Sequence, residues 1–253
     1  MITSILKQAW NIYRKNFLVI AGVVLVIWVP LELLVSYMDY FVFDPDDLRK
    51  SFKLTQFVDN FIGIIATAGV IAIGYTACRG ERLSFRDAMS TGFQSWGRMW
   101  WTRLLSGLAI LLGCILLIIP GFYLLIRLTL VEPIAVCEHI SGSAAMRRSF
   151  ELTRGHFWKL VLLGLVFGAL FVVLIACVVI PPLFIPALDN WLIDAATSLL
   201  GDLVGAFGTL CVLCAYTTFS KTICTPEPNA ALESNATIAP DHSEIAEKTP
   251  TVS

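Results

Sequence analysis

Four ionisable side chains interrupt the apolar runs of this sequence and are the residues best suited to polar chemistry. They are Glu32, Arg127, Glu132 and Asp202. A charge at the centre of a bilayer costs at least about 2.5–3.5 kcal/mol on insertion scales, so such residues usually face protein or water. Carboxylates and a guanidinium at that depth can pair with one another, bind an ion or hold the polar end of a lipid. We therefore predict a polar cluster within the membrane.

The spacing of these charges indicates where their partners lie. Arg127 and Glu132 are five residues apart, which is a poor spacing for a direct pair on one helix, because three or four is preferred. We expect the partner of Arg127 on another helix, with Glu32 or Asp202 as the first choice. In a structural interpretation the charges fix how the first, fourth and sixth spans pack. In a functional one they line a cavity, open to the outer leaflet, for a lipid head group, an ion or a small solute.

Cysteine and histidine residues form no recognisable catalytic or metal-binding pattern. Cys211-x-x-Cys214 has the spacing of a redox or metal motif, but it lies in an apolar run, where small buried hydrophobes explain it better. His139 and His156 are expected near the cytoplasmic interface, and no arrangement resembles a zinc site or a catalytic triad. We therefore expect seven free thiols, no cofactor and no enzyme activity.

The composition is that of a membrane protein. Hydrophobic residues make up 57% of the chain and charged residues 15%, whereas a soluble domain has about 25% charged residues. The formal net charge of −1 gives no basic field that would attract nucleic acid. Membrane lipids and other membrane proteins are the expected partners, and the sequence does not set the size of an assembly.

Six apolar runs are long enough to cross a bilayer as helices, which requires about 20 mostly apolar residues. They cover residues 17–38, 57–78, 100–119, 121–138, 157–180 and 191–220. Only Pro120-Gly121 separates the third run from the fourth, so these two are expected to form a tight helical hairpin. Pro133 lacks an N–H and is expected to kink the fourth helix.

Charge asymmetry and composition set the orientation and the domain limits. Lys and Arg gather before the first span, between the second and third, and between the fourth and fifth. The positive-inside rule then places both termini in the cytoplasm of a multi-pass inner-membrane protein. Residues 223–253 have no aromatic side chain and several acids and prolines, which predicts a disordered cytoplasmic tail. The integral membrane domain is residues 1–222.

Three cytoplasm-side segments look alike. In residues 5–17, 84–100 and 143–157 an aromatic side chain precedes another by seven residues, and each segment reads as an amphipathic helix along the inner interface. Because each precedes two spans, the chain is interpreted as a three-fold parallel repeat. Alternatively, the three segments are alike only because any connector on the inner side of this protein is expected to be basic and aromatic. Arg147 and Arg148 are candidate contacts for anionic lipid, although the positive-inside rule also accounts for them.

One stretch, residues 119–160, resembles a known family. The matching positions are Pro120-Gly121, Tyr123, Arg127, Glu132-Pro133, Glu138, Ala145-Met146-x-Arg148-Ser149, Leu152, Gly155 and Phe157. They resemble the signature of a prokaryotic membrane-domain family related to the N-terminal membrane domain of glycerophosphodiester phosphodiesterases, which also has stand-alone members. The resemblance implies a helical integral membrane protein. It does not imply phosphodiesterase activity, because that chemistry belongs to a separate soluble barrel for which we expect no room in this chain.

The sequence therefore predicts an all-α polytopic membrane protein with six transmembrane helices. The leading hypothesis for its function is a non-enzymatic membrane scaffold or regulatory component that contacts lipid or partner proteins. The alternative is a transporter or lipid-handling protein that uses Glu32, Arg127, Glu132 and Asp202. A cavity running past Glu132 and Asp202 would favour transport, and a dry bundle in which these charges pair would favour a scaffold.

Overall fold

The computed structural model describes residues 2–42, 57–184 and 190–224, and all the regular structure in these ranges is helical. The helices are α1 (Ile2–Lys15), α2 (Phe17–Phe41), α4 (Gly63–Cys78), α5 (Phe85–Leu116), α6 (Ile118–Arg127), α7 (Val131–Cys137), α8 (Gly142–Thr153), α9 (Phe157–Phe184) and α10 (Trp191–Cys224). A helical turn at residues 57–61 precedes α4. Of the predicted tail, residues 225–253 lie outside the described residues.

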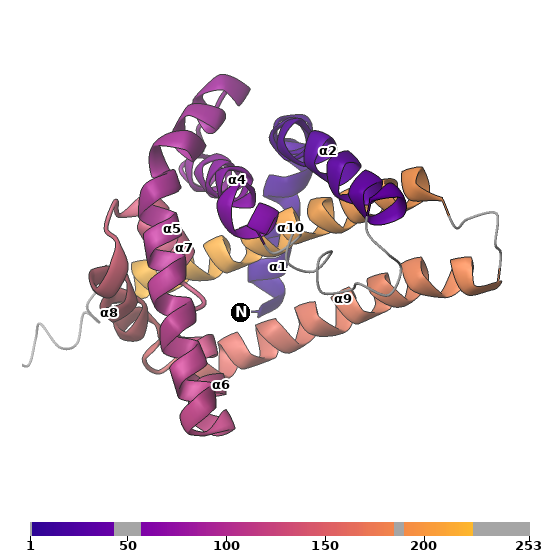
Figure 1. Cartoon of the computed structure of the whole chain (residues 1–253). Helices are drawn as coiled ribbons and strands as arrows, with labels where there is room; N and C mark the ends of the chain where they lie inside the picture. Colours follow the sequence, from indigo (N-terminus) through magenta and orange to yellow (C-terminus); the bar gives the residue numbers. More distant parts are fainter. Residues whose placement is uncertain (1, 43–56, 185–189, 225–253) are drawn as a thin grey trace, which may run out of the picture.

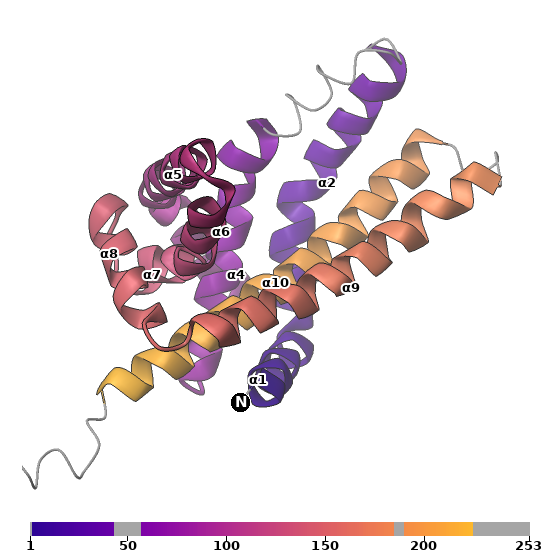
Figure 2. The same ribbon diagram turned by 90° about the horizontal axis from the view of Figure 1, so that it is seen from below.

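The long helix α10 forms the centre of the arrangement. It packs on α1, α2 and α4, and it runs alongside α9 in the opposite direction (Figures 1 and 2). Leu210, Leu213 and Phe219 of α10 are almost completely buried. A Cβ atom added at Gly74 of α4 would collide with the side chains of Leu210 and Leu213. The missing side chain at Gly74 therefore allows α4 and α10 to approach closely.

Four helical segments in the described ranges are long and apolar enough to cross a membrane. They are Phe17–Phe41, Phe85–Leu116, Ile118–Cys137 and Trp191–Ser220. The apolar helix at Gly63–Cys78 is shorter, and the first part of α9, Phe157–Leu170, is also apolar. Large apolar side chains stand exposed on the outside of the bundle, and Ile118 is 80% exposed, as expected where hydrocarbon rather than water is the solvent. The chain is thus an all-helical protein with several candidate spans.

Helix α5 joins two elements that were predicted to be separate. An interfacial helix at residues 84–100 and a span at 100–119 were predicted, but the structure has one helix of 32 residues. It begins where the Ser84 side chain accepts a hydrogen bond from the Asp87 backbone N–H at 3.3 Å. The two parts are continuous because no proline lies between Phe85 and Leu116 to interrupt the hydrogen-bond ladder.

The turn after α5 lies earlier than predicted. Only Leu117, in an extended conformation, separates α5 from α6. Pro120 is the third residue of α6, where its missing N–H has no helical partner to lose. Gly121 is a point of close helix approach rather than a turn residue, because a Cβ atom there would lie 2.7 Å from the backbone nitrogen of Cys114.

The predicted fourth span, residues 121–138, is two helices instead of one kinked helix. Residues 128–130 form a turn between α6 and α7. In a continuous helix Pro133 would leave the Thr129 carbonyl without its hydrogen bond. The chain breaks one turn earlier instead, so that Pro133 falls in the first turn of α7, where an N–H is not required. The break leaves the Arg127 carbonyl at the end of α6. It accepts a hydrogen bond from the Ser149 hydroxyl of α8 at 2.6 Å.

Candidate functional site

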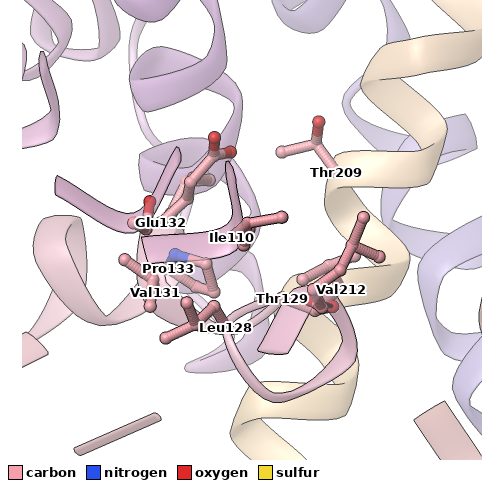
Figure 3. A pocket seen from close by; sticks show the side chains of 11 residues that line it. Ile110, Leu128, Thr129, Val131, Glu132, Pro133, Thr209 and Val212 are labelled. Carbon is pink, nitrogen blue, oxygen red and sulfur yellow. Dashed lines mark hydrogen bonds between the residues drawn. The ribbon is translucent and has the colours of Figure 1, made fainter. Parts of the chain in front are cut away.

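A pocket of about 360 Å³ opens beside the break between α6 and α7. Its walls come from α4 (Ile71), α5 (Ser106, Ile110), the break and its flanks (Leu125, Leu128, Thr129, Val131, Glu132, Pro133) and α10 (Thr209, Val212). In Figure 3, Val131, Glu132 and Pro133 lie on one side of the pocket, and Thr209 and Val212 lie across from them. Mostly apolar walls with a few convergent polar groups are typical of small-molecule sites.

Hydrogen bonds at the break beside the pocket hold the turn between α6 and α7. The Thr129 hydroxyl donates to the Leu125 carbonyl at 3.0 Å, which closes the end of α6. The Val131 N–H donates to the Leu128 carbonyl at 3.1 Å across the turn. Irregular backbone in a membrane protein is tolerated where it is hydrogen-bonded in this way or where it borders a cavity.

Glu132 forms an ion pair with Arg103 of α5 at the wall of the pocket. Its Oε1 atom accepts hydrogen bonds from Arg103 Nε at 2.9 Å and Nη2 at 2.6 Å. Arg103 Nη1 also donates to the Asp59 carbonyl at 3.4 Å. Both bonds to Glu132 end on one oxygen, and the side chain is 35% exposed. In the described ranges Oε2 has no recorded protein donor, so it can accept a hydrogen bond from a ligand.

Glu32 and Asp202 come together beside Asp59, which also lies next to Arg103 of the Glu132 ion pair. They lie on α2 and α10, close enough to interact electrostatically with each other and with Asp59. Glu32 forms a side-chain hydrogen bond with Ser198. Asp202 Oδ2 is buried and has no hydrogen-bond partner in the described part of the chain. Within that part no group of three or more His, Cys, Asp or Glu side chains is arranged to hold a metal ion.

Arg127 does not pair with Glu32 or Asp202, so our first choice of partner is wrong. Its Nε donates to the Tyr123 hydroxyl at 2.8 Å. Its Nη1 donates to α8, where the Phe150 carbonyl accepts at 3.0 Å and the Thr153 hydroxyl at 3.1 Å.

The break in the fourth segment explains the different partner. Arg127 is the last residue of α6, and the chain turns directly after it. The guanidinium also lies 5.2 Å from the ring centre of Tyr123 and 5.4 Å from that of Phe150. Arg127 therefore fastens α6 to α8, whereas the predicted partners assumed one straight helix.

The two arginines of α8 that are candidate lipid contacts, Arg147 and Arg148, have different partners within the protein. Arg148 Nε lies 3.3 Å from both carboxylate oxygens of Glu138, and Tyr216 of α10 donates to Glu138 Oε1 at 3.0 Å. Burial opposes the charge of Arg148, but Glu138 more than offsets it, so the pKa of Arg148 is raised. Arg148 Nη1 also reaches Glu151 at 3.4 Å. Arg147 is 85% exposed and 3.9 Å from Glu151, so it is the more available cation.

Comparison with known families identifies one match. The family model described as the membrane domain of glycerophosphoryl diester phosphodiesterase matches residues 99–225, which is half of the chain. The matched range includes Arg103, Arg127, Glu132 and Glu138, together with the pocket walls supplied by α5, α6, α7 and α10. No curated protein and no solved structure matches the chain.

Proposed function

Because the chain belongs to the family of the membrane domain of glycerophosphoryl diester phosphodiesterase, we propose that it is a non-enzymatic, lipid-handling membrane protein. Its ligand is an amphipathic molecule bound in the pocket beside the α6–α7 break. The observation that carries the proposal is the interrupted candidate span at Ile118–Cys137, whose break lines an apolar pocket and presents Glu132 to it. Broken helices that border a cavity mark binding sites in many membrane proteins.

The lining specifies the chemistry of the ligand. Apolar side chains of α4, α5, α6 and α10 suit a hydrocarbon chain, and the volume is at the low end of the range of about 300–1,000 Å³ for small-molecule pockets. The free oxygen of Glu132 accepts a hydrogen bond from a hydroxyl or amine at the polar end. Arg103 balances the charge of Glu132, so the pocket does not require a cationic ligand.

We extend the proposal to the topology of the chain. Six spans are formed when α4 and α9 are added to the four long candidates, with both termini in the cytoplasm of a prokaryotic inner membrane. The excess of Lys and Arg in the segments before α2, α5 and α9 supports this orientation. In a three-fold repeat, α1 and α8 are the separate interfacial helices that precede α2 and α9. In the middle unit the equivalent interfacial helix is the first part of α5.

A scaffold or regulatory role is the second candidate, and the Glu138 network favours it. Glu138 joins α7, α8 and α10 through Arg148 and Tyr216. A protein that needs only to hold its shape and contact partners would pair its charges in this manner. In that case the pocket binds nothing specifically, and filling it has no effect on ligand binding.

The pocket is tested by filling it. Thr209→Trp places an indole between α10 and the break, and among the described residues the Thr209 hydroxyl bonds only to the Gly205 carbonyl of its own helix. Leu200→Trp is the matched control, because Leu200 lies on α10 and is 55% exposed. The probe is monoolein, which has one acyl chain and two hydroxyl donors, added to the full-length protein in detergent micelles and followed by native mass spectrometry. We expect Thr209→Trp to weaken monoolein binding at least about tenfold, a loss of about 1.4 kcal/mol.

The control and the unfolding temperature decide between the two functions. Leu200→Trp should bind monoolein like the wild type, and both variants should keep the wild-type unfolding temperature. Equal binding by Thr209→Trp and the wild type, or no binding by a folded wild type, would reject the lipid pocket and favour the scaffold.

A further inference from the structure

We propose that the junction of α6, α8 and α9 binds the phosphate of an anionic membrane phospholipid, with Arg127 as the anchor. The junction is distinct from the pocket at Glu132, because none of the side chains that line that pocket donates to or accepts from the Arg127 side chain. The inference therefore stands independently of what the pocket binds.

The first observation is that Arg127 holds a positive charge with neutral partners. Its recorded acceptors are the Tyr123 hydroxyl, the Phe150 carbonyl and the Thr153 hydroxyl. In the described part of the chain Arg127 forms no ion pair with an Asp or Glu, and its Nη2 atom makes no recorded hydrogen bond. A guanidinium has five N–H donors in a planar fork, so donors remain for an anion.

The second observation is that two more cations lie at the same junction. Arg154 follows Thr153 at the end of α8, and Lys159 lies in the first turn of α9. The Tyr123 and Phe157 rings are 5.3 Å apart and hold the start of α9 against α6. Arg154 and Lys159 are exposed, and neither forms an ion pair with another described residue.

The nearby acid does not neutralise these three cations. Glu151 of α8 is bonded to Arg148 at 3.4 Å and lies 3.9 Å from Arg147, so it is engaged by the other arginines of α8. The predicted lipid contacts, Arg147 and Arg148, thus have acidic partners, whereas the cations at the junction do not. An unneutralised cluster beside an apolar bundle attracts anionic head groups.

The third observation identifies the anion as part of a lipid. Trp158 is 79% exposed and Tyr123 is 41% exposed, and tryptophan and tyrosine are enriched at the level of the head groups. Leu162 and Leu165, further along α9, are 49% and 63% exposed and offer an apolar track beyond the cations. Arginine matches phosphate geometry through two parallel hydrogen bonds. A phosphate with acyl chains satisfies both the cations and the apolar track.

The test uses a double variant that removes charge without removing structural contacts. Arg154→Gln with Lys159→Gln leaves every recorded hydrogen bond of Arg127 in place. The full-length protein in a mild detergent is titrated with phosphatidylglycerol, and binding is followed by the rise in unfolding temperature. Removing two cations near an anionic surface should weaken phosphatidylglycerol binding by the double variant about 30-fold. Phosphatidylcholine, which has no net charge, should bind the wild type weakly.

The matched control is Arg82→Gln with Arg86→Gln. Both of these arginines are exposed and lie just before or at the start of α5, and the pair changes the net charge by the same amount. This control should keep the wild-type affinity for phosphatidylglycerol. Equal losses in the two double variants would overturn the site, because they would show that only the overall charge matters.

Two further measurements complete the test. Arg127→Lys keeps the charge but loses the planar fork, so it should bind phosphatidylglycerol more weakly than the wild type at a temperature where both are folded. Phosphatidylcholine binding as tight as phosphatidylglycerol binding would overturn the proposal. Displacement of phosphatidylglycerol by equimolar inorganic phosphate would also overturn it, since the site would then recognise a free anion rather than a lipid.

Discussion

Two arginine–glutamate pairs of similar exposure have different surroundings in this protein. The side chains of Arg103 and Glu132 are 29% and 35% exposed, and those of Arg148 and Glu138 are 28% and 26% exposed. Both pairs join helices that are neighbours in space, so residue type and exposure do not distinguish them. The difference lies in how many hydrogen bonds each carboxylate accepts and in what it faces.

Glu138 uses both carboxylate oxygens within the protein. Arg148 bonds to each oxygen, and Tyr216 bonds to Oε1, so three helices depend on one side chain. Glu132 accepts both of its hydrogen bonds on Oε1 and borders a pocket. A fully used carboxylate acts as a structural lock, whereas a half-used carboxylate beside a cavity is available to a ligand. The comparison makes opposite predictions for the two glutamates.

Glu138→Ala should have the largest effect on stability. It leaves the Tyr216 hydroxyl, in a residue that is 4% exposed, and the Arg148 guanidinium without their acceptor. Breaking a buried pair costs about 3–5 kcal/mol, and partial exposure reduces this, so we expect a loss of about 3 kcal/mol in the free energy of unfolding. Denaturant titration in micelles measures it.

The control for this variant is Glu151→Ala, which removes a more exposed carboxylate from the same network. Its side chain is 54% exposed, so its loss should be about 0.5 kcal/mol. A loss for Glu138→Ala that is as small as this would mean that the Glu138 network is not a structural lock.

Tyr216→Phe should have an intermediate effect. It removes one donor to Glu138 and leaves the Arg148 pair and the apolar packing of the ring in place. One hydrogen bond to a charged group is worth about 1.5–3 kcal/mol, and Glu138 keeps its other donor, so we expect a loss of about 1 kcal/mol. Combined with Glu138→Ala, the second substitution should add little, because both remove the same bond. Full additivity in this double-mutant cycle would contradict the network.

Glu132→Gln should change stability least and ligand binding most. The pair is about one third exposed, and glutamine keeps an acceptor for Arg103, so the free energy of unfolding should fall by only about 0.5 kcal/mol. Monoolein affinity should fall about tenfold, because a neutral amide is a weaker acceptor than a carboxylate. Glu138→Gln should leave that affinity unchanged. Identical binding losses in both variants would remove the distinction between lock and site.

The helical, membrane-embedded character of the chain could be predicted from sequence because apolar run length is a local property. The predicted starts of the first and last spans, Phe17 and Trp191, are the starts of α2 and α10. The family resemblance is confirmed because its motif lies inside the matched range. Both the helix starts and the family motif depend on residues that are close together in the sequence.

The positions of side chains across the bundle could not be predicted, because they depend on helix rotation and on the break at residues 128–130. Pro133 signalled a missing hydrogen bond, but not where the helix would end. Arg127 consequently points to α8, and Glu132 finds Arg103. The overlooked signal was Arg103 itself, a cation inside the predicted third span that required a partner. Similarly, the absence of proline between Phe85 and Leu116 favoured one helix over two.

The continuity of α5 has a mechanical consequence. With 32 residues at 1.5 Å each, it is a rod about 48 Å long, which exceeds the hydrocarbon thickness of about 30 Å. Its Ser84 end and the stretch that carries Ser106 and Ile110 at the pocket belong to one stiff body (Figure 1). A small tilt imposed at the Ser84 end would swing that pocket wall in the same rigid motion. Movement at the Ser84 end would therefore be transmitted along α5 to the wall of the pocket.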